Sequence, residues 1–447
     1  MTLTLIGLAL VTLSGFLALT SMGAATWSFW ERLALAYGVG LGLFTYLLFA
    51  ALAFGLPVSA PSIFVVLAIL LLVAGAGAWA HRDPTIGPPA APLSGPPTPR
   101  SRVARFMVGS SLALVFTLTI VAFGIAVHWP ISSWDALTVF DGRGRALFAE
   151  QNLLPLKNNA LWGAFPLLTS IGHALVYALG GTIAAVLYPP YYLALLGVFY
   201  LNVMKVAGRL SAAVFTTILA LTPILWQHAS EPLTNLPFAF YFGAGTIYVY
   251  RWVLSSHTPH LVLGGLLYGL SSWTRYGSEP LLLAVVIPLA LYALPRKRYS
   301  APCLLVLTYA AFHLPWFLYQ RYALGEHGTK IFGITLSLWN IPRFELTATY
   351  LWRFLTSTST QGTIWLIFLF LFVANLPKWR DPSAFLALAL LLGFGAWTAS
   401  IYFTGLDVDY LAKSSGERLL LSLIPVAAFY CAVNPLVMSR LSPQDPP

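Results

Sequence analysis

The 447 residues carry a formal net charge of +10, yet 58% of them are hydrophobic and only 9% are charged. A water-soluble globule of this length needs far more charge on its surface, so the composition excludes that class. The basic residues are scattered singly along short predicted loops, which does not support nucleic-acid binding. Cys303 and Cys431 are too few for a disulfide framework or a metal cluster. The chain is predicted to be a polytopic membrane protein.

Apolar segments of about 20 residues, the length that crosses a bilayer as a helix, recur from one end of the chain to the other. Lipid offers no partner to exposed peptide groups, and the segments lack the short alternating pattern of a barrel, so we expect an all-α transmembrane bundle. The first segment has no basic residue before its apolar run, which indicates an uncleaved span. About 13 spans are predicted, near residues 2–20, 33–54, 62–80, 106–127, 183–203, 210–226, 236–254, 260–274, 279–294, 301–318, 361–376, 384–402 and 419–437.

A proline-rich stretch divides the chain. Residues 81–105 are nearly free of large apolar side chains and predict a disordered or polyproline-like cytoplasmic linker, a tether rather than a partner-binding segment. We therefore expect an N-terminal three-span unit at 1–80, a transmembrane core at 106–437 and a cytoplasmic tail at 438–447. No internal repeat stands out, which weakens an interpretation as an inverted-repeat transporter.

The apolar stretch 162–181 decides the orientation of everything that follows it. If it enters the membrane without crossing, the cytoplasmic side holds fourteen Lys and Arg against four Asp and Glu, which is the whole net charge of +10. If it crosses, Arg296, Lys297 and Arg298 lie outside, against the positive-inside rule. We therefore predict a half-inserted helix, with the N-terminus outside and the C-terminus in the cytoplasm.

In this topology, most of the remaining charges gather on the outer side, on four or five separate loops. Such a distribution is expected of an outward-facing active site built at the lipid boundary, because charge near a membrane is costly and is usually kept for function. The main polar residues of these loops are Asp135, Asp141, Arg143, Arg145, Glu150, Lys157, Gln227, His228, Glu231, Arg275, Glu279, Arg321, Glu326, His327, Lys330, Arg343, Glu345, Arg353, Asp407, Asp409, Lys413, Glu417 and Arg418.

Five motifs follow one another on this side. In chain order they are SWDALTVFDGRGRAL at 133–147, WGAFPLLTSIGHALVYALGG at 162–181, SEPLTNLPFAFYF at 230–242, GLSSWTRYGSEPLLL at 269–283 and SGERLLLSLIPVAAF at 415–429. Their order resembles that of the GT-C glycosyltransferases, polytopic enzymes that use polyprenyl-phosphate sugars. The likeness is to the bacterial dolichyl-phosphate-mannose-protein mannosyltransferase-like and aminoarabinose-transferase-like members, and it covers roughly residues 106–437.

The match to that family is imperfect at three places. Phe165 and Pro166 stand where two prolines are common, Glu231 stands where aspartate is more usual, and Arg275 replaces a lysine. The resemblance implies a polyprenyl-phosphate sugar donor, an acceptor that is a glycan, a lipid or a protein, and a place in the bacterial plasma membrane. It leaves a divalent metal open.

The chemistry of such a transfer needs a carboxylate to take a proton from the acceptor and a cation to hold the departing phosphate. Asp135, closest to the membrane edge, is the expected general base; its alternative role is to cap the helix that begins at Ala136. Asp141 is a second catalytic candidate, although a regular helix turns it about 240° away from Asp135. It also forms an i,i+4 pair with Arg145. Glu231 either orients the acceptor or a metal, or complements a helix dipole.

For the donor phosphate we expect Arg275 and Arg418, because guanidinium groups match phosphate oxygens; the alternative is that both side chains only extend to the interface. Lys330 is a further phosphate-binding candidate, in a loop expected near the site; the alternative is a solvated surface charge. His173 and His228 show no metal-ligand spacing, so no metal site is assigned. The D-x-D at Asp407 and Asp409 is discounted, since the chain has no cytosolic nucleotide-binding domain.

Three functions remain open. The first is an inverting membrane glycosyltransferase. The second is a flippase or exporter of a lipid-linked saccharide, which predicts a polar route through the bilayer, although acids are nearly absent from the predicted spans. The third is a non-catalytic membrane scaffold. The sugar and the acceptor are not identified by the sequence.

Overall fold

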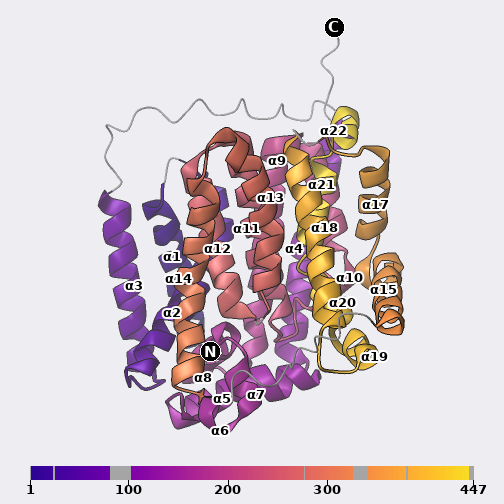
Figure 1. The fold of residues 1–447 in the computed structure, drawn as a ribbon. Helices are drawn as coiled ribbons and strands as arrows, with labels where there is room; N and C mark the ends of the chain where they lie inside the picture. Colours follow the sequence, from indigo (N-terminus) through magenta and orange to yellow (C-terminus); the bar gives the residue numbers. More distant parts are fainter. Residues whose placement is uncertain are drawn as a thin grey trace.

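The protein is described by a computed structural model that covers residues 2–23, 26–80, 102–275, 277–325, 340–378 and 381–441. Every regular element within these ranges is a helix, so the all-α prediction is confirmed (Figure 1). The first half contains α1 (Thr2–Ser21), α2 (Phe29–Ala53), α3 (Ala60–Ala80), α4 (Arg102–His128), η1 (Asp135–Asp141), α5 (Gly142–Glu150), α6 (Leu154–Asn158), α7 (Ala160–Ala164), α8 (Leu168–Ala178), η2 (Ala184–Leu187), α9 (Tyr188–Ala220) and α10 (Pro223–Gln227).

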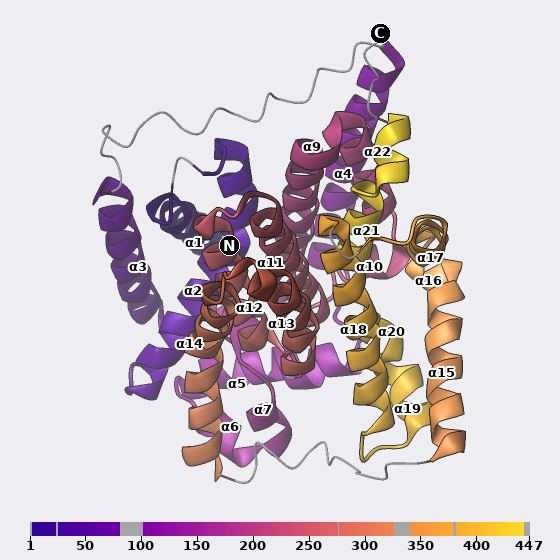
Figure 2. The same ribbon diagram turned by 45° about the horizontal axis from the view of Figure 1, so that its top comes forward.

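The second half is helical as well. It contains α11 (Asn235–Ser255), α12 (Thr258–Thr274), α13 (Glu279–Ala293), η3 (Leu294–Arg296), α14 (Ser300–Tyr322), α15 (Ile341–Thr356), α16 (Thr358–Gln361), α17 (Ile364–Ala374), α18 (Pro382–Tyr402), α19 (Val408–Leu411), η5 (Ala412–Gly416), α20 (Glu417–Leu420), α21 (Ile424–Ala432) and α22 (Pro435–Leu441). Figures 1 and 2 place α3 at one edge of the bundle and α15 and α17 at the opposite edge.

Eight helices of the described residues are long and apolar enough to cross a membrane, or nine if the bent pair 408–420 and 424–432 forms one span. Their apolar side chains remain exposed on α1, α3, α4 and α14, as lipid-facing helices require. The chain is therefore a membrane helical bundle. The number of thirteen spans stays a prediction.

Helix α9 is a hairpin rather than a rod. The Tyr192 hydroxyl donates a hydrogen bond to the Ala220 carbonyl at 2.7 Å. In a straight helix these two residues would lie roughly 40 Å apart, at about 1.5 Å per residue. The reversal occurs at Gly208, whose φ of +88° is a conformation that glycine adopts without steric cost. The two legs correspond to the predicted spans 183–203 and 210–226.

The stretch 162–181 begins and ends at the same end of the bundle. At its start, Gln320 near the end of α14 donates to the carbonyls of Gly163 and Ala164 at 2.9 and 3.1 Å. At its end, Thr4 near the start of α1 donates to the Leu179 carbonyl at 3.2 Å. Both helix ends lie with α5 to α8 at the lower end in Figure 1. Helix α8 has 11 residues, about half the length that the hydrocarbon core requires.

A fully buried arginine fixes this stretch. The guanidinium of Arg143 donates to the carbonyls of Trp162 and Phe165 at 2.7 Å and of Pro166 at 2.8 Å. Its Nε donates to the Ser170 hydroxyl at 2.7 Å. These carbonyls lie where the chain leaves α7 and enters α8, so one side chain satisfies backbone groups that no helix can pair. Burial lowers the pKa of Arg143 to about 9, and the side chain therefore remains charged at neutral pH.

The opposite end of the bundle has its own charged cluster. Glu31 at the start of α2 is fully buried and bonded to Lys205, to Arg251 at 3.1 Å and to the Tyr248 hydroxyl at 2.8 Å. Arg251 also donates to Asn202 at 2.9 Å. These contacts join α2 to α9 and α11, so the predicted N-terminal unit is packed firmly against the core.

The predicted linker and tail are only partly described. Residues 81–101 lie outside the described residues, whereas 102–105, assigned to the linker from sequence, form the first turn of α4. Of the tail 438–447, residues 442–447 also lie outside the described part, and the earlier ones belong to α22.

The non-crossing path of 162–181 predicts a labelling pattern. In a Cys303→Ser background, Lys157→Cys and Thr182→Cys should react with a membrane-impermeant thiol reagent from the same side of sealed vesicles. His257→Cys, at the other end of the bundle between α11 and α12, should react only from the opposite side. Reaction of positions 157 and 182 from opposite sides would show that the stretch crosses.

Candidate functional site

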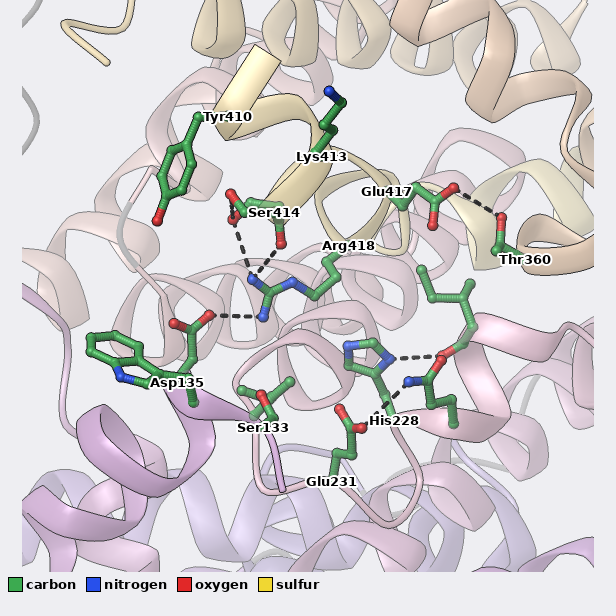
Figure 3. A pocket seen from close by; sticks show the side chains of 15 residues that line it. Ser133, Asp135, His228, Glu231, Thr360, Tyr410, Lys413, Ser414, Glu417 and Arg418 are labelled. Carbon is green, nitrogen blue, oxygen red and sulfur yellow. Dashed lines mark hydrogen bonds and ion pairs between the residues drawn. The ribbon is translucent and has the colours of Figure 1, made fainter. Parts of the chain in front are cut away.

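A cavity of about 520 Å³ opens at the same end of the bundle as α5 to α8. It lies between the start of η1, the turn between α10 and α11, and the segment from α19 to α20 (Figure 3). Its lining residues are Ser133, Trp134, Asp135, Ile224, Gln227, His228, Glu231, Leu233, Thr360, Tyr410, Lys413, Ser414, Ser415, Glu417 and Arg418. Three predicted site residues, Asp135, Glu231 and Arg418, therefore share one cavity.

The centre of the cavity is an ion pair between Asp135 and Arg418. Arg418 Nη1 lies 2.8 Å from Asp135 Oδ2, and the two side chains point toward one another (Figure 3). Arg418 also donates to the Ser414 carbonyl at 2.7 Å and to the Ser415 hydroxyl at 3.2 Å. The side chains of Asp135 and Arg418 are 37% and 23% exposed, so both remain accessible from the cavity.

Two π-helical segments present this pair. Asp135 is the first residue of η1, and Arg418 follows directly on η5, near the start of α20. π-Helical segments are rare in proteins, but those that occur often lie at functional sites. Their wider turn changes the direction in which the side chains point. No side chain caps η1, so the alternative role of Asp135 as a helix cap does not match this geometry. Its carboxylate faces Arg418 instead.

Two further carboxylates line the cavity. Glu231 accepts a hydrogen bond from Gln227 at 3.4 Å. Burial raises the pKa of Glu231, against the opposing effects of that hydrogen bond and of the Arg418 charge. Glu417 turns toward Thr360, whose hydroxyl donates to it at 3.2 Å (Figure 3). Asp135 is thus the carboxylate of this cavity that directly faces a cation.

Behind the cavity wall lies a chain of hydrogen bonds that begins at Arg275. Arg275 donates to the Asn235 side-chain oxygen, so the Asn235 amide nitrogen faces His228 and donates to its Nε2 at 3.0 Å. The other ring nitrogen, Nδ1, donates to the Ile224 carbonyl at 2.8 Å. His228 is therefore neutral. Arg275 does not line the cavity; it supports the wall residue His228 through Asn235.

The charges of Arg275 and Arg418 both act on His228. Burial, with a smaller effect of both arginines, lowers the pKa of His228 to about 4. Burial, followed by the charge of Arg418, also lowers the pKa of Arg275 to about 10, while Asp135 acts in the opposite direction. The lining itself carries Lys413 and Arg418 against Asp135, Glu231 and Glu417, and the guanidinium of Arg418 is the lining group best suited to bind a phosphate oxygen.

Asp141 does not line this cavity. It is fully buried and accepts hydrogen bonds from the Tyr177 hydroxyl and from Arg145 at 2.8 Å, and it lies 3.4 Å from His173 Nδ1. Burial alone would raise its pKa, but these three partners outweigh burial and lower it to about 2. In this position Asp141 holds α5 against α8, and it pairs with Arg145 as the sequence predicts.

The remaining candidates have other surroundings. Lys330 lies outside the described residues. Asp407 caps α19 by accepting from the Tyr410 amide at 2.8 Å, and Asp409 pairs with Lys413 at 2.5 Å and with the Tyr350 hydroxyl, so both members of the D-x-D have structural partners. Among the described residues, no group of three or more His, Cys, Asp or Glu is arranged to hold a metal ion.

Several lining residues were not among the site candidates chosen from the sequence. Tyr410 lies on α19, Lys413 lies on η5, and Thr360 lies on α16. The indole of Trp134 and the ring of Tyr410 are both exposed at this cavity. The only sequence signal for them is their occurrence in predicted outer loops.

In comparisons with known proteins, the chain matches no family model, no curated protein and no solved structure. The function must therefore be argued from the geometry of the site.

The neutral state of His228 predicts a pH-dependent stability. Folding depresses its pKa from 6.5 to about 4, so the unfolded chain binds the proton first as the pH falls. Its contribution to the free energy of unfolding is complete above about pH 6.5 and is lost as the pH falls toward 4. Between about pH 7 and 4.5, the melting temperature in detergent should fall more for the wild type than for His228→Gln. Equal slopes would contradict this assignment.

Proposed function

We propose that the protein is an integral-membrane inverting glycosyltransferase that moves a sugar from a polyprenyl-phosphate donor to a hydroxyl or amine of an acceptor. The observation that carries the proposal is the accessible Asp135–Arg418 pair in a cavity at one end of a membrane bundle. Its sequence resemblance to GT-C enzymes supports the same reaction. We further propose a bacterial plasma membrane location, with this cavity on the outer side.

The reaction needs one base and one anion-binding group. Asp135 accepts the proton of the acceptor nucleophile, whose oxygen or nitrogen forms a new bond to the anomeric carbon. The bond from that carbon to the phosphate oxygen breaks at the same time, and its electron pair leaves with the polyprenyl phosphate. Arg418 stabilises the negative charge that develops there, since a guanidinium forms two parallel hydrogen bonds with phosphate oxygens.

Donor binding must open the ion pair. In an inverting displacement the base and the leaving phosphate lie on opposite faces of the anomeric carbon, so the sugar has to enter between the two groups. The donor phosphate replaces the Asp135 carboxylate as the partner of Arg418. This exchange keeps the arginine neutralised throughout and leaves Asp135 free to act as a base only when donor is present.

The surrounding groups fit secondary roles in this scheme. The buried positive charge of Arg275 adds to the field that favours the phosphate, through a wall fixed by Asn235 and His228. Glu231 lies in the same cavity, where its carboxyl group can form a hydrogen bond with an acceptor hydroxyl. The exposed rings of Trp134 and Tyr410 offer flat apolar surfaces to a sugar ring.

The distribution of buried charge favours transfer over lipid flipping. The fully buried acids and arginines of the described residues, Glu31, Asp141 and Arg143, lie near the two ends of the bundle. The centre is packed by aromatic rings, with Tyr191 and Tyr241 hydroxyls bonded to each other at 2.8 Å. A flippase needs a continuous polar route between those ends.

Removing the base should stop the reaction without unfolding the protein. We expect Asp135→Asn to lower the turnover number by about a hundred- to ten-thousand-fold, the range for loss of a general base. The measurement is transfer of radiolabelled sugar by purified protein from a polyprenyl-phosphate donor to a membrane extract that supplies the acceptor. Asp381→Asn, at the opposite end of the bundle, is the matched control and should keep wild-type activity. Undiminished transfer by Asp135→Asn would remove this residue from the mechanism.

Removing the phosphate ligand should have a different kinetic signature. Arg418→Met should raise the KM for the donor at least tenfold and also lower kcat, because the guanidinium binds both the ground-state phosphate and the leaving group. Arg418→Lys should restore part of the activity, since it keeps the charge but loses the planar fork. Arg353→Met, an exposed arginine on α15, should behave as wild type. An unchanged donor KM in Arg418→Met would contradict the phosphate assignment.

A further inference from the structure

A second cavity, of about 360 Å³, lies among α5, α6 and α7 at the same end of the bundle. It shares no lining residue with the first cavity and is within the size range of small-molecule sites. Its lining residues are Ala146, Glu150, Leu154, Pro155, Asn158, Asn159 and Trp162.

This lining combines amides, one carboxylate and an indole. Amide and carboxylate groups form directed hydrogen bonds with hydroxyl groups, and an indole presents a flat apolar face. The Asn159 amide is oriented, because its Oδ1 caps α7 by accepting from the backbone amides of Leu161 and Trp162 at 3.0 and 3.3 Å. Its two Nδ2 donors are thereby left for another partner. A polyhydroxylated ring with an apolar face fits this combination.

Three polar groups of the cavity have no protein partner within the described part of the chain. The side chains of Glu150 and Asn158 form no hydrogen bond or ion pair there, and neither does Asn159 Nδ2. On the same helix as Glu150, the nearby Asp141 and Arg143 are fully bonded to protein groups. The carboxylate and the amides of this cavity therefore have their hydrogen-bonding capacity available to a ligand.

A hydrogen bond connects this cavity to η1, the segment that begins at Asp135. Trp162 Nε1 donates to the Thr138 carbonyl at 2.9 Å, and Thr138 belongs to η1, one turn after Asp135. Segments η1 and α5 form one continuous helix with Asp135 at its start and Glu150 at its end. At about 1.5 Å per residue, the two carboxylates are separated by roughly 20 Å. That separation is much longer than one sugar ring.

We infer that this second cavity binds a neutral sugar ring of an oligosaccharide acceptor, the reacting end of which reaches Asp135. The inference rests on the proposed glycosyl transfer and names its acceptor as an extended glycan. An anionic sugar is disfavoured, because the one charged lining residue is Glu150.

The test is equilibrium binding without donor. Purified protein in detergent is titrated with four neutral tetrasaccharides, derived from α-glucan, cellulose, chitin and xylan, and binding is followed by saturation-transfer NMR and calorimetry. At least one should bind, and the double variant Glu150→Gln with Asn158→Ala should bind it at least tenfold more weakly. Both side chains are exposed, so the variant should keep the wild-type melting temperature. Glu345→Gln, an exposed acid on α15, is the matched control.

Two results would overturn the inference: no binding of any of the four saccharides, or binding that the double variant leaves unchanged. Failure of the glycosyltransferase proposal is distinguishable, because binding is measured without donor and without turnover. If saccharide binds here but Asp135→Asn leaves transfer unchanged, the catalytic assignment fails and the cavity remains a saccharide site. If transfer depends on Asp135 but the double variant binds normally, only the acceptor subsite is wrong.

Discussion

The contact between Asp135 and Arg418 joins the beginning of the helical core to its last part, across a cavity that stays open. These two opposite charges, at the edge of an apolar bundle, stay paired until a ligand binds one of them more favourably. In the proposed transfer, a lipid phosphate is such a partner for the arginine, and an acceptor hydroxyl is such a partner for the carboxylate. On that proposal the same two residues hold the empty site together and carry out the reaction in the occupied one.

Charged groups outside the cavity hold the surrounding helices in place, so the cavity does not need contacts across its centre. Arg143 uses its guanidinium to satisfy the carbonyls between α7 and α8, and Asp141 holds α5 against α8 through Tyr177 and His173. These buried contacts join the segment 162–181 to η1 and α5, and so hold the helix that carries Asp135. Arg275 acts in a similar way on the other side of the cavity, through Asn235 and His228. Asp135 and Arg418 need few contacts of their own to stay in place, because the residues that support the cavity are hydrogen-bonded to other protein groups.

Much of this arrangement is predictable from the sequence, for one physical reason. Lipid excludes charge, so acids and bases are confined to the ends of the bundle, and residues far apart in sequence must meet there. In the structure Asp135, Glu231 and Arg418 line one cavity, as expected from this constraint. The prediction that 162–181 enters the membrane without crossing came instead from the positive-inside rule.

The rest depends on contacts that sequence alone does not reveal. Asp141 was a catalytic candidate, but the wider turns of η1 and the packing of α8 direct it into the protein. Nothing in the sequence separates Arg143, which is buried against backbone carbonyls, from the exposed Arg145 two residues later. Tyr410, Lys413 and Thr360 reach the cavity only because the folded chain brings α16, α19 and η5 to its edge. The functional assignment itself stays a proposal.

The central claim is that this membrane bundle transfers a sugar, and the most direct test is incubation of the purified wild-type protein with a panel of radiolabelled polyprenyl-phosphate sugars and a membrane extract as acceptor source. The account predicts that at least one donor loses its label to an acceptor while free polyprenyl phosphate accumulates. If every sugar stays on its lipid, and a labelled lipid only changes leaflet in sealed vesicles, the protein is a carrier and the account is wrong.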